Sequence, residues 1–352
     1  MPRVPKVLLA RTITRVTFYQ WLALERCAFK GLLAFLELDG SLPDPIPTRA
    51  SLVGTFYHRA MEVALTAETE AEVEQILESE IKKLQSTVSR WPHLRRAGSV
   101  SGWDEINNAF TLATQMASNR HTVGSVDSVL VEKELCSRNG LLIGRPDYFL
   151  VARDRAKLLE YKSSKIRDDL GDPNEDHINQ LRFYSALIVD RYEVVQIDAR
   201  IESLSGDSYE VAITRKEAKE FAARVAATIE VVNRSAAQDR EFTHLTKPSN
   251  ENCAFCESRI LCAPFKREQD RIGLEGENFV LEGVIKKCDL DSALKIAAVT
   301  VADDYRKALV TLIIPTSGCE KIGVGLRTLF VNLRRHGGEL VWGHTSRVLS
   351  CG

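Results

Sequence analysis

Two short acidic motifs constrain the fold of this chain more than any other sequence feature. The first is Gly144-Arg145-Pro146-Asp147 and the second is Glu160-Tyr161-Lys162, with twelve residues between the two acids. Both lie in segments with the alternating pattern of β-strands, in which successive side chains point to opposite faces. Glu160 and Lys162 therefore share a face, and Asp147 and Glu160 converge if the two strands are neighbours.

A converging pair of acids of this kind can bind one hard cation. Carboxylate oxygens and water are the ligands that suit Mg²⁺ or Mn²⁺. Such an ion lowers the pKa of a bound water and neutralises charge that builds up on a phosphate, while Lys162 positions that water or helps to deprotonate it. Taken alone, a Glu-x-Lys motif on a strand is more often an exposed charge pair.

The segments around both motifs predict an α/β core with a mixed sheet. A hairpin is expected over residues 129–135 and 141–151, because Asn139-Gly140 is a strong signal for a hairpin turn. Further strands are expected over residues 157–162, 194–202 and 209–213, and helices over residues 177–190 and 217–232. A helical region precedes this core, with helices over residues 13–38, 52–84 and 103–117.

In this context, Pro146-Asp147 followed by Glu160-x-Lys162 resembles the defining motif of PD-(D/E)XK nucleases. Two further elements resemble the RecB-like branch: Gln180 and Tyr184, one helical turn apart, and Gly54-x3-His58 upstream. The resemblance implies a restriction-endonuclease-like fold with a divalent metal site. The implied metal ligands are His58, Asp147, Glu160 and the main-chain carbonyl of Tyr161. The implied catalytic residues are Asp147, Glu160 and Lys162, with Gln180 and Tyr184 supporting the site and contacting DNA phosphate.

Each of these residues also has a simpler explanation. His58 alone would more often be a structural histidine, and Gln180 with Tyr184 would be one face of an amphipathic helix. The order of all the motifs, with the expected strand and helix at each step, favours the nuclease site.

The cysteines form a second pattern. The chain has eight, and no disulfide framework is expected in a protein that we interpret as intracellular. Cys253-x2-Cys256-x5-Cys262 supplies three thiolates, one fewer than a tetrahedral zinc ion or a four-iron cluster normally needs. The scattered cysteines are interpreted as structural thiols: Cys136, Cys288, Cys319 and Cys351.

Cys27 is the fourth ligand that the family resemblance implies. RecB-like and CRISPR-associated iron–sulfur exonucleases hold a 4Fe-4S cluster with one cysteine before the catalytic core and three after it. In those relatives proline often follows the first cysteine, whereas Ala28 stands here. The cluster would join segments separated by 225 residues and would be structural. A zinc ion at the same ligands and a redox role are the alternatives.

Short segments of strand character, separated by turns, follow residue 276. Strands are expected over residues 279–286, 294–301, 308–314, 328–333 and 340–342, the length of a small five-stranded barrel, of which an OB-fold is one example. We therefore predict a nuclease domain over residues 1–275, with a helical insertion at about 60–124, and a small β-rich domain over 276–352. That domain would bind single-stranded DNA or protein partners.

Charge and hydropathy set outer limits on function. A net charge of -1 means that DNA binding must use a local basic patch. Apolar runs are too short to span a bilayer and no signal peptide is apparent, so we expect a cytoplasmic protein without a membrane contact. The expected function is Mg²⁺- or Mn²⁺-dependent hydrolysis of single-stranded DNA or DNA ends, by an exonuclease rather than an endonuclease. The rival is a catalytically silent iron–sulfur subunit that binds DNA or assembles with other proteins.

Overall fold

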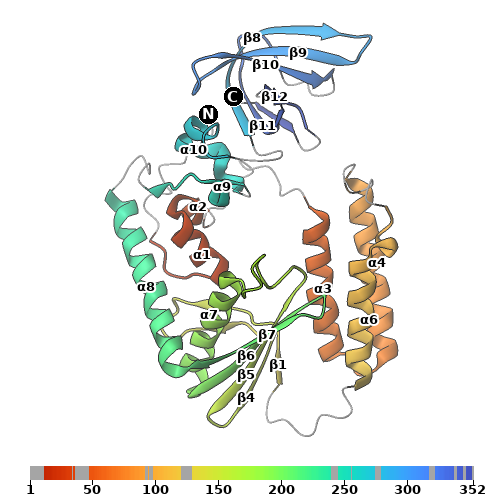
Figure 1. Cartoon of the computed structure of the whole chain (residues 1–352), viewed down its shortest axis with the longest axis vertical. Helices are drawn as coiled ribbons and strands as arrows, with labels where there is room; N and C mark the ends of the chain where they lie inside the picture. Colours follow the sequence, from red (N-terminus) through yellow and green to blue (C-terminus); the bar gives the residue numbers. More distant parts are fainter. Residues whose placement is uncertain are drawn as a thin grey trace. The chain divides into compact units, whose positions relative to one another are not determined.

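The computed structural model describes residues 12–33, 35, 47–91, 94, 98–119, 129–238, 245–254, 256–273, 279–316, 322–336, 339–343 and 346–350. Contacts between Cα atoms divide the chain into two compact units (Figure 1). The sheet unit comprises residues 13–19 and 47–228, and the barrel unit comprises residues 1–12, 20–46 and 229–352.

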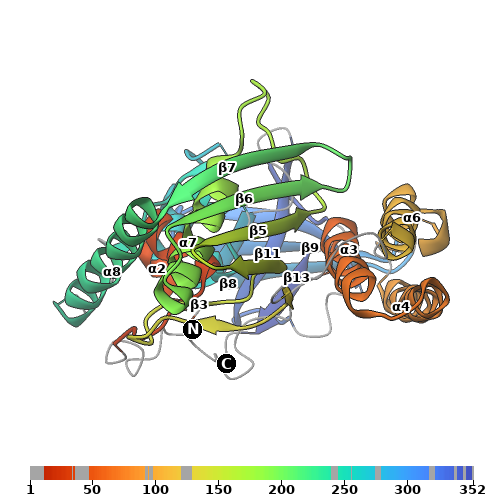
Figure 2. The same ribbon diagram turned by 90° about the horizontal axis from the view of Figure 1, so that it is seen from below.

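A mixed sheet of five strands forms the core of the sheet unit (Figure 2). Across the sheet its strands are β1 (Val129–Val131), β4 (Tyr148–Ala152), β5 (Arg155–Lys162), β6 (Gln196–Ser203) and β7 (Ser208–Thr214). Neighbouring strands are antiparallel except β5 and β6. Helix α7 (Glu175–Tyr192) connects this parallel pair and packs on both strands, because parallel strands require a long crossover. The predicted α/β fold with a mixed sheet is confirmed.

The predicted hairpin is divided into two short ladders. Strands β2 (Leu135–Cys136) and β3 (Ile143–Gly144) pair around the Asn139-Gly140 turn, where Gly140 adopts a φ of 73°. Beyond them, β1 pairs with β4. One break in the hairpin falls at Glu132, whose φ is 47°, and the other falls at Pro146-Asp147. Both breaks lie beside the acidic motif.

A layer of helices packs on one end of the sheet. It contains α3 (Arg49–Thr66), α4 (Glu70–Arg90), the short 3-10 helix η2 (Val100–Gly102) and α6 (Asp104–Asn119). Thr48 and Ser51 begin α3 with a reciprocal capping box. The buried ring of Tyr57 in α3 packs edge-on against Tyr161 of β5, with ring centroids 5.9 Å apart. The helix predicted over residues 52–84 is two helices in the structure, because α3 ends at its C-cap Ala67 and α4 begins at Glu70. Residues 120–124 of the expected insertion lie outside the described residues.

A second sheet, barrel-like and rich in short antiparallel strands, dominates the barrel unit. Its strands are β8 (Phe279–Asp291), β9 (Ile296–Asp303), β10 (Leu309–Pro315), β11 (Arg327–His336), β12 (Glu339–Val341) and β13 (Arg347–Ser350). The order is β10-β9-β8-β11-β12, with β13 paired to β11, and β10 also approaches β12. The predicted β-rich C-terminal segment is confirmed, whereas the domain boundary near residue 276 stays a prediction.

Helices make up the rest of the described chain. They are α1 (Phe18–Arg26), α2 (Ala28–Leu33), α8 (Arg215–Gln238), α9 (Asn250–Cys253), the 3-10 helix η5 (Glu257–Leu261) and α10 (Ala263–Glu268). Cys27 lies in the break between α1 and α2, not inside a single helix. None of the helices in the described part of the chain is long and apolar enough to cross a membrane.

Candidate active site and cysteine pocket

The two acids of the motifs meet at the junction of β4 and β5. Tyr148 pairs with Leu159 in the antiparallel ladder, so Asp147 lies beside Glu160. The main-chain N–H of Asp147 donates to Glu160 Oε1 at 3.2 Å, and the N–H of Tyr161 donates to Asp147 Oδ2 at 2.7 Å. Both carboxylates are thus fixed by main-chain donors as well as by their strands.

Three polar side chains surround Glu160. Lys162 Nζ lies 3.3 Å from Glu160 Oε2, on the same face of β5. Gln180 of α7 donates from Nε2 to Glu160 Oε2 at 3.2 Å and to the Tyr184 hydroxyl at 3.3 Å. The structure therefore brings Glu160, Lys162, Gln180 and Tyr184 together as one buried hydrogen-bonded chain.

Helix α7 aims Gln180 and Tyr184 at the sheet because its apolar side faces the same way. Leu181, Leu187 and Ile188 are fully buried under the helix. Residue 144 also matters for this packing. A Cβ there would lie only 2.7 Å from Tyr184 Cε1, so glycine in the Gly144 motif leaves room for the ring.

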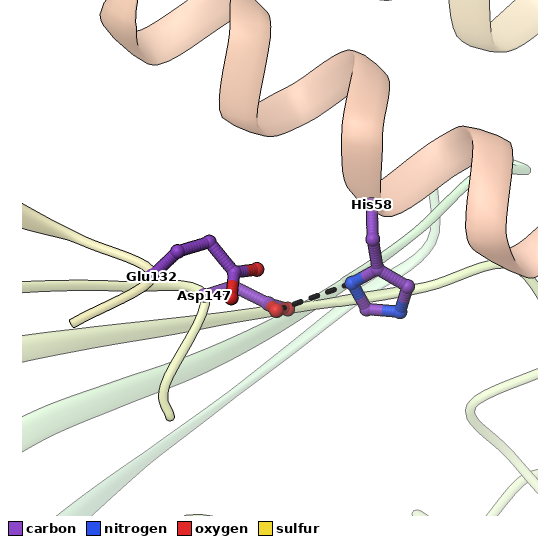
Figure 3. Close-up of side chains that lie close together, drawn as sticks. All are labelled: His58, Glu132 and Asp147. Atoms are coloured by element: carbon purple, nitrogen blue, oxygen red, sulfur yellow. Dashed lines mark hydrogen bonds and ion pairs between the residues drawn. The ribbon is translucent and has the colours of Figure 1, made fainter. Parts of the chain in front are cut away.

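His58 joins this centre from the helical layer. Its Nδ1 lies 3.1 Å from Asp147 Oδ1 (Figure 3). The neighbouring Tyr57 is buried against Tyr161, so the packing that anchors α3 also sets the position of His58. The Tyr161 side chain points away from Glu160 and Lys162, as strand alternation predicts. The role of its carbonyl as a ligand stays a prediction.

Glu132 is a site residue that the sequence did not indicate. One ligand atom each from His58, Glu132 and Asp147 lies within 4.8 Å of the others, and within the described residues no other group of three is as compact (Figure 3). Glu132 follows β1, and its N–H donates to the Asp147 carbonyl at 3.0 Å. Its left-handed backbone costs about 1–3 kcal/mol in a non-glycine residue. In the sequence, Glu132 is the first residue of a Glu-Lys-Glu run after a strand, and a charged run of this kind does not by itself indicate a site.

Burial and charge crowding perturb the pKa values at this centre. Burial, followed by the charge of Asp147, raises the pKa of Glu160 from 4.5 to about 8. The same two causes raise the pKa of Glu132 to about 7. Burial alone would raise the pKa of Asp147. The hydrogen bond with His58, the charge of Lys162 and the Tyr161 N–H together outweigh burial and lower this pKa. Burial alone would lower the pKa of Lys162, but the negative charge of Glu160 outweighs burial and raises it. Lys162 is therefore an ammonium at neutral pH.

A family model decides the identity of this arrangement. The model of the PD-(D/E)XK nuclease superfamily matches residues 15–263, a span that includes every residue of the acidic centre and all four cysteines of the predicted cluster. The chain belongs to the PD-(D/E)XK nuclease superfamily. This nuclease matches no sequence among the curated proteins that were compared.

Two solved structures are similar to the nuclease at low identity. One is a provisionally named exonuclease from Eubacterium rectale, with 12% identity over 65% of this chain and 84% of that chain, at a TM-score of 0.39. The other is SSO0001, with 18% identity over 59% of this chain and 94% of that chain, at a TM-score of 0.27. Both TM-scores are below 0.5, so the assignment rests on the family model.

The four cysteines of the predicted cluster line one pocket of the barrel unit. Cys27, Cys253, Cys256 and Cys262 share this pocket with apolar and basic side chains that include Phe29, Lys30, Arg259 and Phe265. All four thiols are buried. Asn252 of α9 holds the two segments together, because its Nδ2 donates to the carbonyl of Arg26 at 3.3 Å and to that of Lys247 at 2.9 Å.

The surroundings of two thiols in this pocket, Cys253 and Cys262, raise their pKa values. Burial, followed by the other three cysteines, raises the pKa of Cys262 to about 12 even though it accepts a hydrogen bond from the Phe265 N–H. Burial also raises the pKa of Cys253. The scattered cysteines lie elsewhere: Cys136 and Cys288 are half-buried in strands, and Cys319 and Cys351 are outside the described residues.

Helix α10, which begins directly after Cys262, is bound to the barrel-like sheet within the same unit. Lys266 forms a buried ion pair with Glu282 of β8. The side-chain amide of Gln269 pairs with both main-chain groups of Val280, accepting at 2.9 Å and donating at 3.0 Å. The cysteine loop and the first strand of the barrel are therefore one packed structure.

Proposed function

We propose that this nuclease is a RecB-like, Mg²⁺- or Mn²⁺-dependent deoxyribonuclease that hydrolyses phosphodiester bonds of single-stranded DNA or DNA ends, acting as an exonuclease. The observation that carries the proposal is the hydrogen-bonded centre in which Asp147, Glu160 and Lys162 meet Gln180 and His58. These side chains come from a helix, two strands and a second helix, in the order of the RecB-like motifs. Single-strand preference and exonuclease action rest on the resemblance alone.

The donor set fits a hard divalent cation. Carboxylate oxygens from Asp147 and Glu160 suit Mg²⁺ or Mn²⁺, with the ring nitrogen of His58 and the Tyr161 carbonyl as the further ligands that the resemblance implies. A bound cation would supply a water of lowered pKa and would neutralise charge on the phosphate. It would also oppose the raised pKa of Glu160, which burial causes first and the charge of Asp147 second, because a nearby cation favours the ionised carboxylate.

Lys162 would position, not deprotonate, the attacking water. Its raised pKa keeps the ammonium charged at neutral pH, and it already donates to Glu160 Oε2. An ammonium at this place would also attract the phosphate of the substrate. Gln180 would hold Glu160 in place and, with Tyr184, would contact the DNA phosphate.

The cysteine pocket would hold a structural 4Fe-4S cluster. A single zinc ion with Zn–S bonds of about 2.3 Å would bring four sulfur atoms to about 3.8 Å from one another. Within the described residues, no three cysteine sulfur atoms form a group as compact as 4.8 Å, although all four line one pocket. This wider spacing favours a larger group over one ion. The pocket's apolar wall suits a buried cluster.

Three biological uses agree with such an activity: trimming of DNA ends in repair or recombination, processing of new spacers in CRISPR adaptation, and defence against foreign DNA. A catalytically silent DNA-binding subunit is the rival function. The complete set of Asp147, Glu160 and Lys162 argues against it.

A nuclease assay separates these two functions. We expect wild-type protein to shorten end-labelled single-stranded DNA with Mn²⁺ and to be inactive with EDTA. Lys162→Ala should lower the rate by about 10³-fold or more while DNA binding and folding persist, because it removes the group that positions the water. Lys165→Ala, an exposed lysine three residues further on, is the matched control. Equal rates for Lys162→Ala and wild type would refute the site, and inactive wild-type protein that still binds DNA would favour the silent subunit.

A further inference from the structure

Tyr19 is an exposed aromatic residue near the acidic centre, and the proposed chemistry does not use it. It is 63% exposed, whereas its neighbour Phe18 is buried. Single exposed apolar side chains are common on protein surfaces and need no explanation of their own. Tyr19 differs from these because both the chain before it and the rings beside it are bound to elements of the active centre.

The segment that precedes Tyr19 is bound to the hairpin of the acidic motif. Val16, which is fully buried, forms a parallel bridge with Leu142. The carbonyl of Val16 accepts from the N–H of Ile143 at 2.9 Å. Because the two segments run parallel at this bridge, Tyr19 and Arg145 each follow it by three residues.

A row of aromatic rings joins Tyr19 to the polar side chains of the centre. Ring centroids are 5.2 Å apart between Tyr19 and Phe18, and 5.9 Å apart between Phe18 and Phe183. Phe183 is in turn 6.1 Å from Tyr184, whose hydroxyl is hydrogen-bonded to Gln180. All three ring contacts are edge-to-face, an arrangement that aromatic pairs prefer. The row holds Tyr19 on one side, while most of the residue stays accessible.

The electrostatics of Lys162 also place Tyr19 near the centre. Burial alone would lower the pKa of Lys162, but the charge of Glu160 and then that of Tyr19 raise it. Interactions between charges weaken with distance, so the Tyr19 hydroxyl lies near the Lys162 ammonium.

Arg145 adds a positive charge next to the acidic motif. It directly precedes Pro146-Asp147 and is exposed. Among the residues that the structure describes, no acid or hydrogen-bond acceptor engages its side chain. A guanidinium without an internal partner can bind a phosphate through its planar set of donors. In a protein of net charge -1, local groups of this kind must attract the DNA backbone.

We propose that Tyr19 stacks on a nucleobase of a single strand whose backbone passes Arg145, and that this contact selects single strands over duplex. In a duplex the neighbouring pairs cover both faces of each base, whereas the bases of a single strand can open and stack on an aromatic side chain. Every base has such a face, so the contact carries no sequence preference. This inference rests on the proposed function and deepens it, because it names a residue for the single-strand preference.

Binding of short single strands tests the role of Tyr19. Full-length protein is mixed, in EDTA to prevent cleavage, with labelled strands of about ten nucleotides that carry one abasic sugar at successive positions. We expect wild type to have one position at which loss of the base weakens binding by about fivefold or more, as for one stacked base. Tyr19→Ala should bind intact strands more weakly by the same factor and should be insensitive to the abasic sugar at that position. Affinity for duplex should be equal in the two proteins.

Two further variants separate stacking from other roles of the side chain. Tyr19→Phe keeps the ring and should bind as wild type does, whereas Tyr19→Leu keeps an apolar side chain without an aromatic face and should bind as Tyr19→Ala does. In cleavage with Mn²⁺, Tyr19→Ala should raise KM and leave kcat close to that of wild type. A contact that is made equally before and during the reaction contributes to binding and not to the chemical step.

The inference is overturned if Tyr19→Ala or Tyr19→Leu binds intact strands with wild-type affinity, or if Tyr19→Ala keeps the wild-type response to the abasic sugars. Binding and cleavage are scored separately. A wild-type protein that cleaves single strands, with a Tyr19→Ala variant of equal affinity, would refute the inference alone. A Tyr19-dependent abasic position without any cleavage in Mn²⁺ would refute the proposed function alone.

Discussion

The acidic centre and the cysteine pocket of this nuclease are both buried, but they are built in different ways. In the acidic centre, each side chain is fixed by a named donor or acceptor, from the Tyr161 N–H on Asp147 to Gln180 on Glu160. In the cysteine pocket, four buried thiols lie among apolar and basic side chains. The first arrangement fixes the geometry of its polar side chains, whereas the second gathers thiols in a mostly apolar pocket.

The pKa values separate the two regions in the same way. Glu160 and Glu132 have pKa values near neutrality, at about 8 and about 7, so their charge changes under working conditions. The thiol of Cys262 has a pKa of about 12, so it does not ionise near neutral pH without a metal.

The largest effect is expected from the cysteine pocket. Purified wild-type protein should be brown and contain about four iron atoms per chain, and Cys256→Ala should lose them and become poorly soluble. Cys288→Ser changes a cysteine outside the pocket and should keep its iron and solubility. Iron analysis and visible absorption provide the measurement. Zinc in place of iron after anaerobic purification would contradict the cluster while leaving the acidic centre intact.

A pH effect on stability is expected from the acidic centre. The folded pKa of Glu160 is raised above 4.5, so the folded state holds a proton that the unfolded chain releases at lower pH. In metal-free protein, the contribution of Glu160 to the free energy of unfolding is therefore fully present below pH 4.5. This contribution is lost as the pH rises towards about 8. Melting temperature across pH 5 to pH 8 is the measurement. Glu160→Gln should make the profile shallower, with the slope that comes from Glu132 remaining, and Mn²⁺ should reverse the wild-type slope. A flat wild-type profile would contradict the buried, crowded acid.

A smaller effect on cleavage is expected from Tyr184, which contacts Gln180 and reaches Glu160 only through it. Tyr184→Phe removes the hydroxyl that Gln180 contacts at 3.3 Å, and groups that orient a ligand typically contribute about 10–100-fold to activity or metal affinity. We expect cleavage to fall by about tenfold. Tyr192→Phe, at the other end of α7, is the control. A loss as large as that of Lys162→Ala would show that Tyr184 acts in the chemistry itself.

The smallest effect is expected from the barrel-like sheet. We predict that truncation after Glu275 leaves cleavage of short single strands unchanged and weakens binding of long ones a few-fold, because backbone charge and base stacking on the barrel are lost. Truncation alone would leave Lys266 without Glu282, so Lys266→Met is combined with it. Equal affinity for long strands would favour a protein-binding role, and an insoluble product would show that the contacts of α10 with β8 are essential.

Much of the fold follows from sequence pattern because strand alternation and turn chemistry are local. The Asn139-Gly140 turn, the strand that ends at Lys162 and the helix with Gln180 all lie where they were predicted. The β-rich end was also predictable, since its short strands alternate between buried and exposed residues. These elements carry most of the residues that the motifs indicated.

What the sequence did not indicate depends on contacts between distant segments. Glu132 reaches Asp147 only because its backbone turns left-handed after β1, and nothing local requires that conformation. The break at Cys27 and the binding of Gln269 to Val280 are likewise tertiary. The pairing of Lys266 with Glu282, which joins the cysteine loop to the barrel-like sheet, is also a contact between separate segments.

The central claim is that the acidic centre performs the chemistry while the cysteine pocket maintains the structure. The most direct test is the Mn²⁺-dependent cleavage rate of Glu160→Gln protein whose iron absorption equals that of wild type. Because this variant keeps its shape and its cluster but loses a metal ligand, the account predicts no measurable shortening of end-labelled single-stranded DNA. Cleavage at the wild-type rate would contradict it, since the chemistry would then belong to another part of the molecule.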